Sequence, residues 1–192
     1  MKHILPVCVL ALLAALILPA GAGTLTDALD GKLVRLEKGK VKNVPKGHLA
    51  EKKVIAFYYS AHWCPPCRAF TPGLAKEYAK LSAAHPEFEL IFVSSDRSEA
   101  DMEEYMAWGS MNYPALDFGA KERNKTVSGL AARGIPYLVV VDADGNELAG
   151  KGSEDWVHPS QVIPKLQKIL ADGVPASAGS DERSPSPKHK VY

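Results

Sequence analysis

A pair of cysteines at the junction of two apolar patterns limits how this chain can fold. The run from Lys53 to Tyr59 is almost continuously apolar and rich in β-forming residues, which is typical of a central strand covered on both faces. Cys64 and Cys67 follow it within Trp63-Cys64-Pro65-Pro66-Cys67. Beyond them, apolar side chains recur at helical spacing, namely Phe70, Leu74, Tyr78 and Leu81. The sequence therefore predicts a strand-to-helix junction with Cys64 at the helix N-terminus.

Cysteines at this spacing and place predict redox chemistry. The helix dipole and the free N–H groups at a helix N-terminus favour an anion, so the Cys64 thiol should lose its proton more readily than an ordinary thiol, whose pKa is about 8.5. Cys67, one turn inside the helix, should be shielded and react second. We expect Cys64 to attack a disulfide and Cys67 to resolve the mixed disulfide.

Three other uses of the cysteine pair are weaker. A disulfide that closes four residues constrains the unfolded chain by only about 2 kcal/mol, which makes it a poor structural staple. Zinc usually needs four ligands, and His48, His62 and His85 lack ligand spacing. Covalent haem requires a histidine directly after the second cysteine, where this chain has Arg68. We expect no metal and no cofactor other than the redox-active disulfide Cys64–Cys67.

Helices alternate with apolar strands along the ordered part of the chain. The predicted elements are strands at 33–36, 40–44, 53–59, 88–94, 137–142 and 146–149, and helices after Cys67, from Ser98, within 121–133 and from about Pro159. The first two strands form a hairpin around Lys38-Gly39, and Asp144-Gly145 marks another hairpin. This order predicts an α/β fold with a central mixed sheet, helices on both faces and an N-terminal β-hairpin.

The first 22 residues resemble an export signal. Lys2 and His3 precede an apolar run, Ile4–Leu18, which Pro19 and the small residues of 20–22 close. Cleavage is expected after Ala22. An uncleaved anchor is the alternative, but a bilayer needs about 20 apolar residues. A lipoprotein would need its cysteine at the cleavage site, whereas Cys8 lies inside the apolar run.

Removing this segment leaves residues 23–170 as one domain and 171–192 as a tail. The tail is rich in Ser, Pro, Gly and charge, a composition that predicts disorder. The 23 basic and 22 acidic residues nearly balance, so no basic field for nucleic acid is expected. We also expect a monomer with no membrane span once the signal is removed.

Three features together resemble the thioredoxin superfamily: Trp-Cys-x-x-Cys after a central strand, Pro72 five residues past the second cysteine, and Ile135-Pro136 before a late strand. The segments 58–72 and 88–99 look like the tryparedoxin and nucleoredoxin branch. The resemblance covers roughly Leu29 to Leu148 and implies a thioredoxin-like fold.

The resemblance assigns roles to individual residues. Cys64 matches the attacking cysteine and Cys67 the resolving one. Trp63 matches the aromatic residue beside the site, and Pro136, after Ile135, matches a cis proline that lets a substrate strand pair alongside.

Two positions near the cysteines have open roles. Tyr58 stands where many thioredoxins have a buried Asp, so proton transfer to Cys67 must use water, Tyr58 or another group. Asp96 is one such group; alternatively, it is a solvated residue of a turn. His62 either tunes the pKa of Cys64 or is a solvent-facing loop residue.

The function implied is a protein-disulfide reductase, a thioredoxin- or tryparedoxin-like oxidoreductase that reduces or exchanges disulfides in exported proteins. It would take electrons from an upstream thiol donor and act in the periplasm or outside the cell. Since tryparedoxins and nucleoredoxins are intracellular, exported ResA/TlpA-type reductases for cytochrome maturation are an alternative. An oxidase or isomerase and a non-catalytic partner-binding module also stay open. Pro65 and Pro66 withhold two N–H donors from a Cys64 thiolate, which favours a reductase over a strong oxidant.

Overall fold

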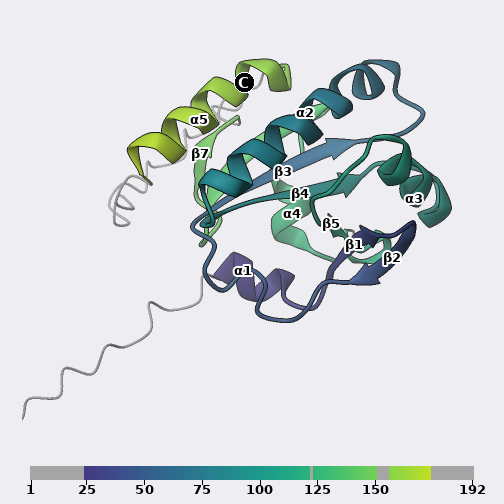
Figure 1. The fold of residues 1–192 in the computed structure, drawn as a ribbon, viewed down its shortest axis with the longest axis horizontal. Coiled ribbons are helices and arrows are strands. Elements are labelled where there is room, and N and C mark those ends of the chain that lie inside the picture. Colours follow the sequence, from purple (N-terminus) through teal and green to yellow (C-terminus); the bar gives the residue numbers. More distant parts are fainter. Residues whose placement is uncertain (1–23, 122, 151–155, 174–192) are drawn as a thin grey trace, which may run out of the picture.

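The computed structural model of this protein describes residues 24–121, 123–150 and 156–173 (Figure 1). The expected signal segment and nearly all of the expected tail lie outside these residues. The elements, in chain order, are α1 (Thr24–Leu29), β1 (Leu33–Glu37), β2 (Lys40–Asn43), β3 (Val54–Ser60), α2 (Pro65–Ala84), β4 (Phe88–Ser94), α3 (Glu99–Trp108), β5 (Ala115–Leu116), the 3-10 helix η1 (Phe118–Ala120), α4 (Lys125–Leu130), β6 (Tyr137–Asp142), β7 (Glu147–Ala149), the 3-10 helix η2 (Pro159–Gln161) and α5 (Ile163–Asp172).

One seven-stranded mixed sheet forms the centre, in the order β2-β1-β5-β4-β3-β6-β7. Strand β3 pairs in parallel with β4 and antiparallel with β6. The N-terminal hairpin joins the sheet through β1, which pairs antiparallel with both β2 and β5. Strand β3 lies inside the sheet and its C-terminal end leads into α2, so the cysteines lie at the C-terminal end of an interior strand.

Alternate residues of β3 serve two separate cores. Ala56 and Tyr58 pack on the face that α2, α3 and α5 cover, while Ile55, Phe57 and Tyr59 pack on the face that α1 and α4 cover. In Figure 1, α2 and α5 run together over one side of the sheet. All seven residues of β3 are buried, as expected for a strand covered on both faces. The predicted fold class is confirmed.

Local sequence signals account for the helix starts. Cys64 caps α2, with Pro65 and Pro66 in the first turn, where a missing N–H costs nothing because the first helical N–H groups have no intrahelical partner. Ser98 caps α3 by accepting from the N–H of Asp101 at 3.2 Å, and Asn124 caps α4 in the same way through Val127.

Several boundaries agree with the sequence predictions and others differ. Strands β4 and β6 span the predicted residues. Helix α1 and the two-residue strand β5 were not expected. Helix α5 ends at Asp172, two residues inside the range assigned to the tail, because Leu166 and Leu170 bury the inner face of its last turns. Within the described residues, none of the helices is long and apolar enough to cross a membrane.

A buried carboxylate joins four elements at the opposite edge of the sheet from the cysteines. Glu89, near the start of β4, is 1% exposed. It accepts a hydrogen bond from Tyr78 of α2 at 2.7 Å and contacts the imidazole of His48. The Glu89 carboxylate also pairs with the ammonium group of Lys52 at 3.9 Å and with the guanidinium group of Arg35, in β1, at 3.7 Å. Burial alone would raise the pKa of Glu89, but these hydrogen bonds and charges lower it.

Candidate active site

Cys64 and Cys67 form a disulfide across the first turn of α2, with their Cα atoms 5.2 Å apart. Cys64 has an extended backbone conformation and caps the helix. Because Pro65 and Pro66 have no N–H, the backbone donor that reaches the Cys64 sulfur is that of Cys67, at 3.3 Å. Cys64 is 4% exposed and Cys67 is fully buried, so Cys64 is the sulfur nearer to solvent.

The loop before β6 lies against Cys64. The peptide bond between Ile135 and Pro136 is cis, as the family resemblance implies. The carbonyl oxygen of Ile135 is 3.8 Å from the sulfur of Cys64. Residues 71 positions apart in the sequence thus meet because β6 pairs directly with β3.

Trp63 lies on the β4 side of the disulfide. Its side chain is 56% exposed, and its indole N–H donates to the carbonyl of Ser95 at 3.1 Å. Since Ser95 directly follows β4, the ring is anchored at one end and leaves most of its surface to solvent. An anchored, exposed indole is a ready contact for a partner.

His62 and Asp96 are joined beside Trp63. The backbone N–H of His62 donates to Asp96 at 2.7 Å, and the His62 ring stacks on Tyr105, with centroids 5.3 Å apart. Ser94 donates a second hydrogen bond to Asp96 at 2.8 Å. Burial raises the pKa of Asp96, although these hydrogen bonds oppose the shift. Asp96 is therefore a half-buried, hydrogen-bonded carboxyl rather than a freely solvated one.

A cluster of buried hydroxyl groups lies behind Cys67. The Tyr58 hydroxyl is 2.8 Å from Thr71 and accepts from Ser60 at 3.0 Å, and the Tyr105 hydroxyl contacts both Ser60 and Thr71. Thr71 also donates to the carbonyl of Cys67 at 2.9 Å. Burial raises the pKa of Tyr58 far above its ordinary value, so its hydroxyl stays protonated.

Of the residues in this hydroxyl cluster, only Tyr58 is a candidate site residue from the sequence alone. Ser60 and Thr71 have no spacing that marks them as partners, and Tyr105 looks like an ordinary apolar residue of a helix stripe. The cluster forms only when α2 and α3 pack on the same face of the sheet.

A hollow of about 290 Å³ is lined by residues on either side of the cysteine pair in the sequence. Its lining residues carry both signs of charge and one exposed aromatic ring; they are His62, Trp63, Arg68, Asp96, Arg97 and Asp101. Arg68 lies over the ring of Trp108, 5.1 Å from its centroid. The arginines were not singled out in the sequence, because charged residues at a strand end and in a helix first turn are common on any surface.

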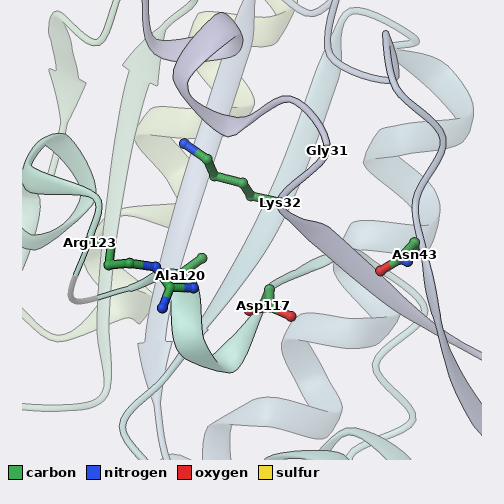
Figure 2. A pocket seen from close by; sticks show the side chains of 6 residues that line it. All are labelled: Gly31, Lys32, Asn43, Asp117, Ala120 and Arg123. Carbon is green, nitrogen blue, oxygen red and sulfur yellow. The ribbon is translucent and has the colours of Figure 1, made fainter.

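A second hollow, of about 270 Å³, lies elsewhere on the domain (Figure 2). It is lined by Gly31, Lys32, Asn43, Asp117, Ala120 and Arg123. None of the site residues predicted from the sequence lines this second hollow. Within the part of the chain that the structure describes, there is also no group of three or more His, Cys, Asp or Glu side chains placed to hold a metal ion.

Comparison with known proteins agrees with this geometry. Residues 51–147 match the sequence model of a family described as thioredoxin-like. Mouse nucleoredoxin is 41% identical over 123 residues, which cover 57% of this chain and 27% of the relative. Tryparedoxin from Trypanosoma brucei brucei is 39% identical over 102 residues, which cover 51% of this chain and 67% of the relative. The chain spans about a fifth to a third of the length of the nucleoredoxins from Arabidopsis, mouse and cattle that it matches.

Solved structures show the same fold. Thioredoxin from Wuchereria bancrofti superposes with a TM-score of 0.56 at 37% identity, over 76% of this chain and 98% of that one. Tryparedoxin I from Crithidia fasciculata gives 0.53 at 32% identity, over 66% and 85%. The matched stretch contains both cysteines and the cis proline. Since the family model covers just over half of the 192 residues and the folds agree, the chain belongs to the thioredoxin-like family.

Proposed function

We propose that this protein reduces or exchanges disulfides in exported proteins, with Cys64 as the nucleophile and Cys67 as the resolving thiol. The observation that carries the proposal is the placement of the cysteine pair. It caps a helix at a sheet edge, its outer sulfur lies 3.8 Å from the cis-proline loop, and its inner sulfur is fully buried. The Cys64 sulfur can therefore react with a sulfur of a partner, whereas Cys67 is shielded from the partner.

Each turnover moves two electrons from the cysteine pair to the substrate. The Cys64 thiolate attacks one sulfur of the substrate disulfide, which forms a mixed disulfide and releases the other substrate sulfur as a thiolate. The Cys67 thiolate then attacks the Cys64 sulfur. The Cys64–Cys67 disulfide forms and the second substrate thiolate leaves. The Cys64–Cys67 disulfide corresponds to the oxidised product of this proposed cycle, which a thiol donor must reduce before the next turnover.

The number of donors around Cys64 supports the reducing direction. A strong oxidant owes its power to a stabilised reduced form, and Pro65 and Pro66 leave the Cys67 N–H as the donor at 3.3 Å. We expect an equilibrium reduction potential of about −250 mV or lower in a glutathione or dithiothreitol series. A value well above about −180 mV would instead make the protein a disulfide donor or isomerase.

The hollow lined by Trp63 and Arg68 supports a small thiol as the upstream electron donor. Arg68, Arg97, Asp96 and Asp101 offer both signs of charge there, which suits a donor that carries carboxylate and ammonium groups. A tryparedoxin II structure similar to this chain (25% identical, TM-score 0.53) is a complex with glutathionylspermidine. Export rests on residues 1–22 alone, and a ResA/TlpA-type role in cytochrome maturation is the alternative in that compartment.

Single cysteine variants separate catalysis from mere binding. We expect Cys64→Ser to abolish dithiothreitol-coupled reduction of insulin, because it removes the nucleophile. Cys67→Ser should retain the first step and accumulate a mixed disulfide that is visible on non-reducing gels and by mass. A partner-binding module would behave differently: the wild type would show no turnover, and Cys64→Ser would keep full partner affinity.

A further inference from the structure

Trp156 contacts the cis-proline loop from a part of the chain that carries no redox motif. Its indole N–H donates to the carbonyl of Pro136 at 2.9 Å. Its ring also covers Gly134, where a Cβ atom would meet the indole at 3.6 Å. Trp156 therefore touches the loop on both sides of Ile135, the residue whose carbonyl faces Cys64.

The order of strands places Trp156 and Trp63 on two sides of the disulfide. The central strands run β4-β3-β6, and Cys64 follows β3. Trp63 is anchored on Ser95, just after β4, whereas Trp156 is anchored on Pro136, just before β6. Trp156 is 44% exposed, so each side of the cysteine pair carries an indole that is fixed by its N–H and open to solvent.

A series of ring contacts fixes Trp156 to the helix that carries the cysteines. Its ring meets His158 edge-on, with centroids 5.7 Å apart, and His158 meets Phe70 of α2 edge-on at 5.5 Å. Phe70 packs in turn on Tyr58 at 5.9 Å. Aromatic pairs at such distances are favourable. The segment after residue 155 thus connects α2 directly to the cis-proline loop.

We propose that Trp156 is a positioning residue for disulfide exchange: it holds the cis-proline loop at its distance from Cys64 and forms a second aromatic wall, across the disulfide from Trp63, against which a protein substrate packs. This inference rests on the proposed function. Two exposed indoles on either side of the nucleophile suit a polypeptide with apolar side chains flanking its disulfide. Tryptophans that become buried when two proteins bind often contribute much of the binding energy. A small disulfide, which reaches only the sulfur, does not need the second wall.

The test compares substrates of two sizes in variants of the full mature chain. Trp156→Phe removes the N–H donor and keeps a ring, and we expect kcat/KM for insulin to fall about 3- to 10-fold, as for the loss of one hydrogen bond. Trp156→Ala removes the wall as well and should cost about 30-fold. The rate with 2-hydroxyethyl disulfide and the reduction potential should stay within about twofold and about 10 mV of wild type, because the cysteine pair itself is unchanged.

Trp108→Phe is the matched control, because Trp108 is also 44% exposed but packs beside Tyr105 and Arg68 instead of the loop. Equal losses on insulin and on the small disulfide would overturn the proposal and leave Trp156 with a general structural role. An undiminished rate for insulin in Trp156→Phe would overturn it too.

Amide hydrogen exchange tests, independently of activity, whether Trp156 holds the cis-proline loop in place. We expect exchange at Ile135 and Tyr137 to accelerate about tenfold in Trp156→Phe and to be unchanged in Trp108→Phe. Unchanged exchange in Trp156→Phe would overturn the positioning role. A wild type that reduces neither substrate would reject the proposed function, and the exchange result would still decide whether Trp156 holds the loop.

Discussion

At the scale of single residues, the two prolines between the cysteines set how a Cys64 thiolate is stabilised. A cap side chain normally accepts from the second or third N–H of its helix. Here the second position is Pro66, and the third is Cys67, whose N–H is the donor that reaches the sulfur. The helix keeps its dipole, but it offers the thiolate one N–H donor fewer than a helix without Pro66 would.

Restoring that donor should make the protein more oxidising. We expect Pro66→Ala to lower the pKa of Cys64 in the reduced protein, because the new N–H stabilises the thiolate. A hydrogen bond to a charged group is worth about 1.5 kcal/mol, so the reduction potential should become less negative by about 30 mV. The measurement is the same thiol–disulfide equilibrium used for the wild type.

Pro164→Ala is the control for this effect. Pro164 lies in the first turn of α5, so the substitution also removes an N-terminal helix proline but gives no donor to Cys64. It should leave the potential unchanged. A Pro66→Ala variant with the wild-type potential would show that the missing donor is not what keeps the pair reducing.

At the scale of elements, Glu89 ties β1, α2, β4 and the segment before β3 together through one buried charge. We expect Glu89→Gln to lower the free energy of unfolding at pH 7 by about 2–3 kcal/mol, since it leaves buried and half-buried cationic partners without their counter-charge. Chemical denaturation at several pH values measures this.

The pH dependence follows from the lowered pKa of Glu89. A carboxyl with a folded pKa below its unfolded value of about 4.3 stabilises the fold in full above that value, and this stabilisation is lost as pH falls through the folded pKa. The gap between wild type and Glu89→Gln should therefore narrow below about pH 4. Glu37→Gln, which removes an exposed pair with Lys42, should change stability by about 0.5 kcal/mol or less at any pH. A gap that is constant with pH would contradict the charge-based explanation.

The elements also show what the sequence predicts and what it does not. Strands β4 and β6 were predicted because their buried residues form runs that are apolar except for Glu89, Ser94 and Asp142. Strand β5 has two residues, Ala115 and Leu116, too few to show a period. Its pairing with β4 and β1 is a tertiary event.

The same limit applies to the site. Cys64 and Cys67 can be predicted because their chemistry depends on local spacing. Pro136 can be predicted because a family resemblance identifies it. Trp156 stands in a polar stretch with no periodic pattern. Its role depends on a hydrogen bond to a residue 20 positions earlier, which only the folded chain brings within reach.

Across the molecule as a whole, buried tyrosines stabilise the fold only while their hydroxyl groups stay protonated. Burial raises the pKa of six tyrosines: Tyr58, Tyr59, Tyr78, Tyr105, Tyr113 and Tyr137. For Tyr137 the value is about 12. A group whose folded pKa is raised contributes fully below its unfolded pKa, and its contribution is lost as pH rises towards the folded value.

We therefore expect one cooperative alkaline transition above about pH 10, the ordinary pKa of tyrosine. Phenolate absorbance from these six residues should appear together with the loss of far-ultraviolet circular dichroism, because each phenol ionises only when the fold opens. Stepwise ionisation with an unchanged dichroism signal would contradict this expectation.

The match to the family ends at residue 147, nine residues before Trp156. The family model thus covers the cysteine pair and the cis proline, while Trp156 lies beyond its last matched residue. A substitution at position 156 therefore leaves both cysteines unchanged and alters the contact that fixes the cis-proline loop.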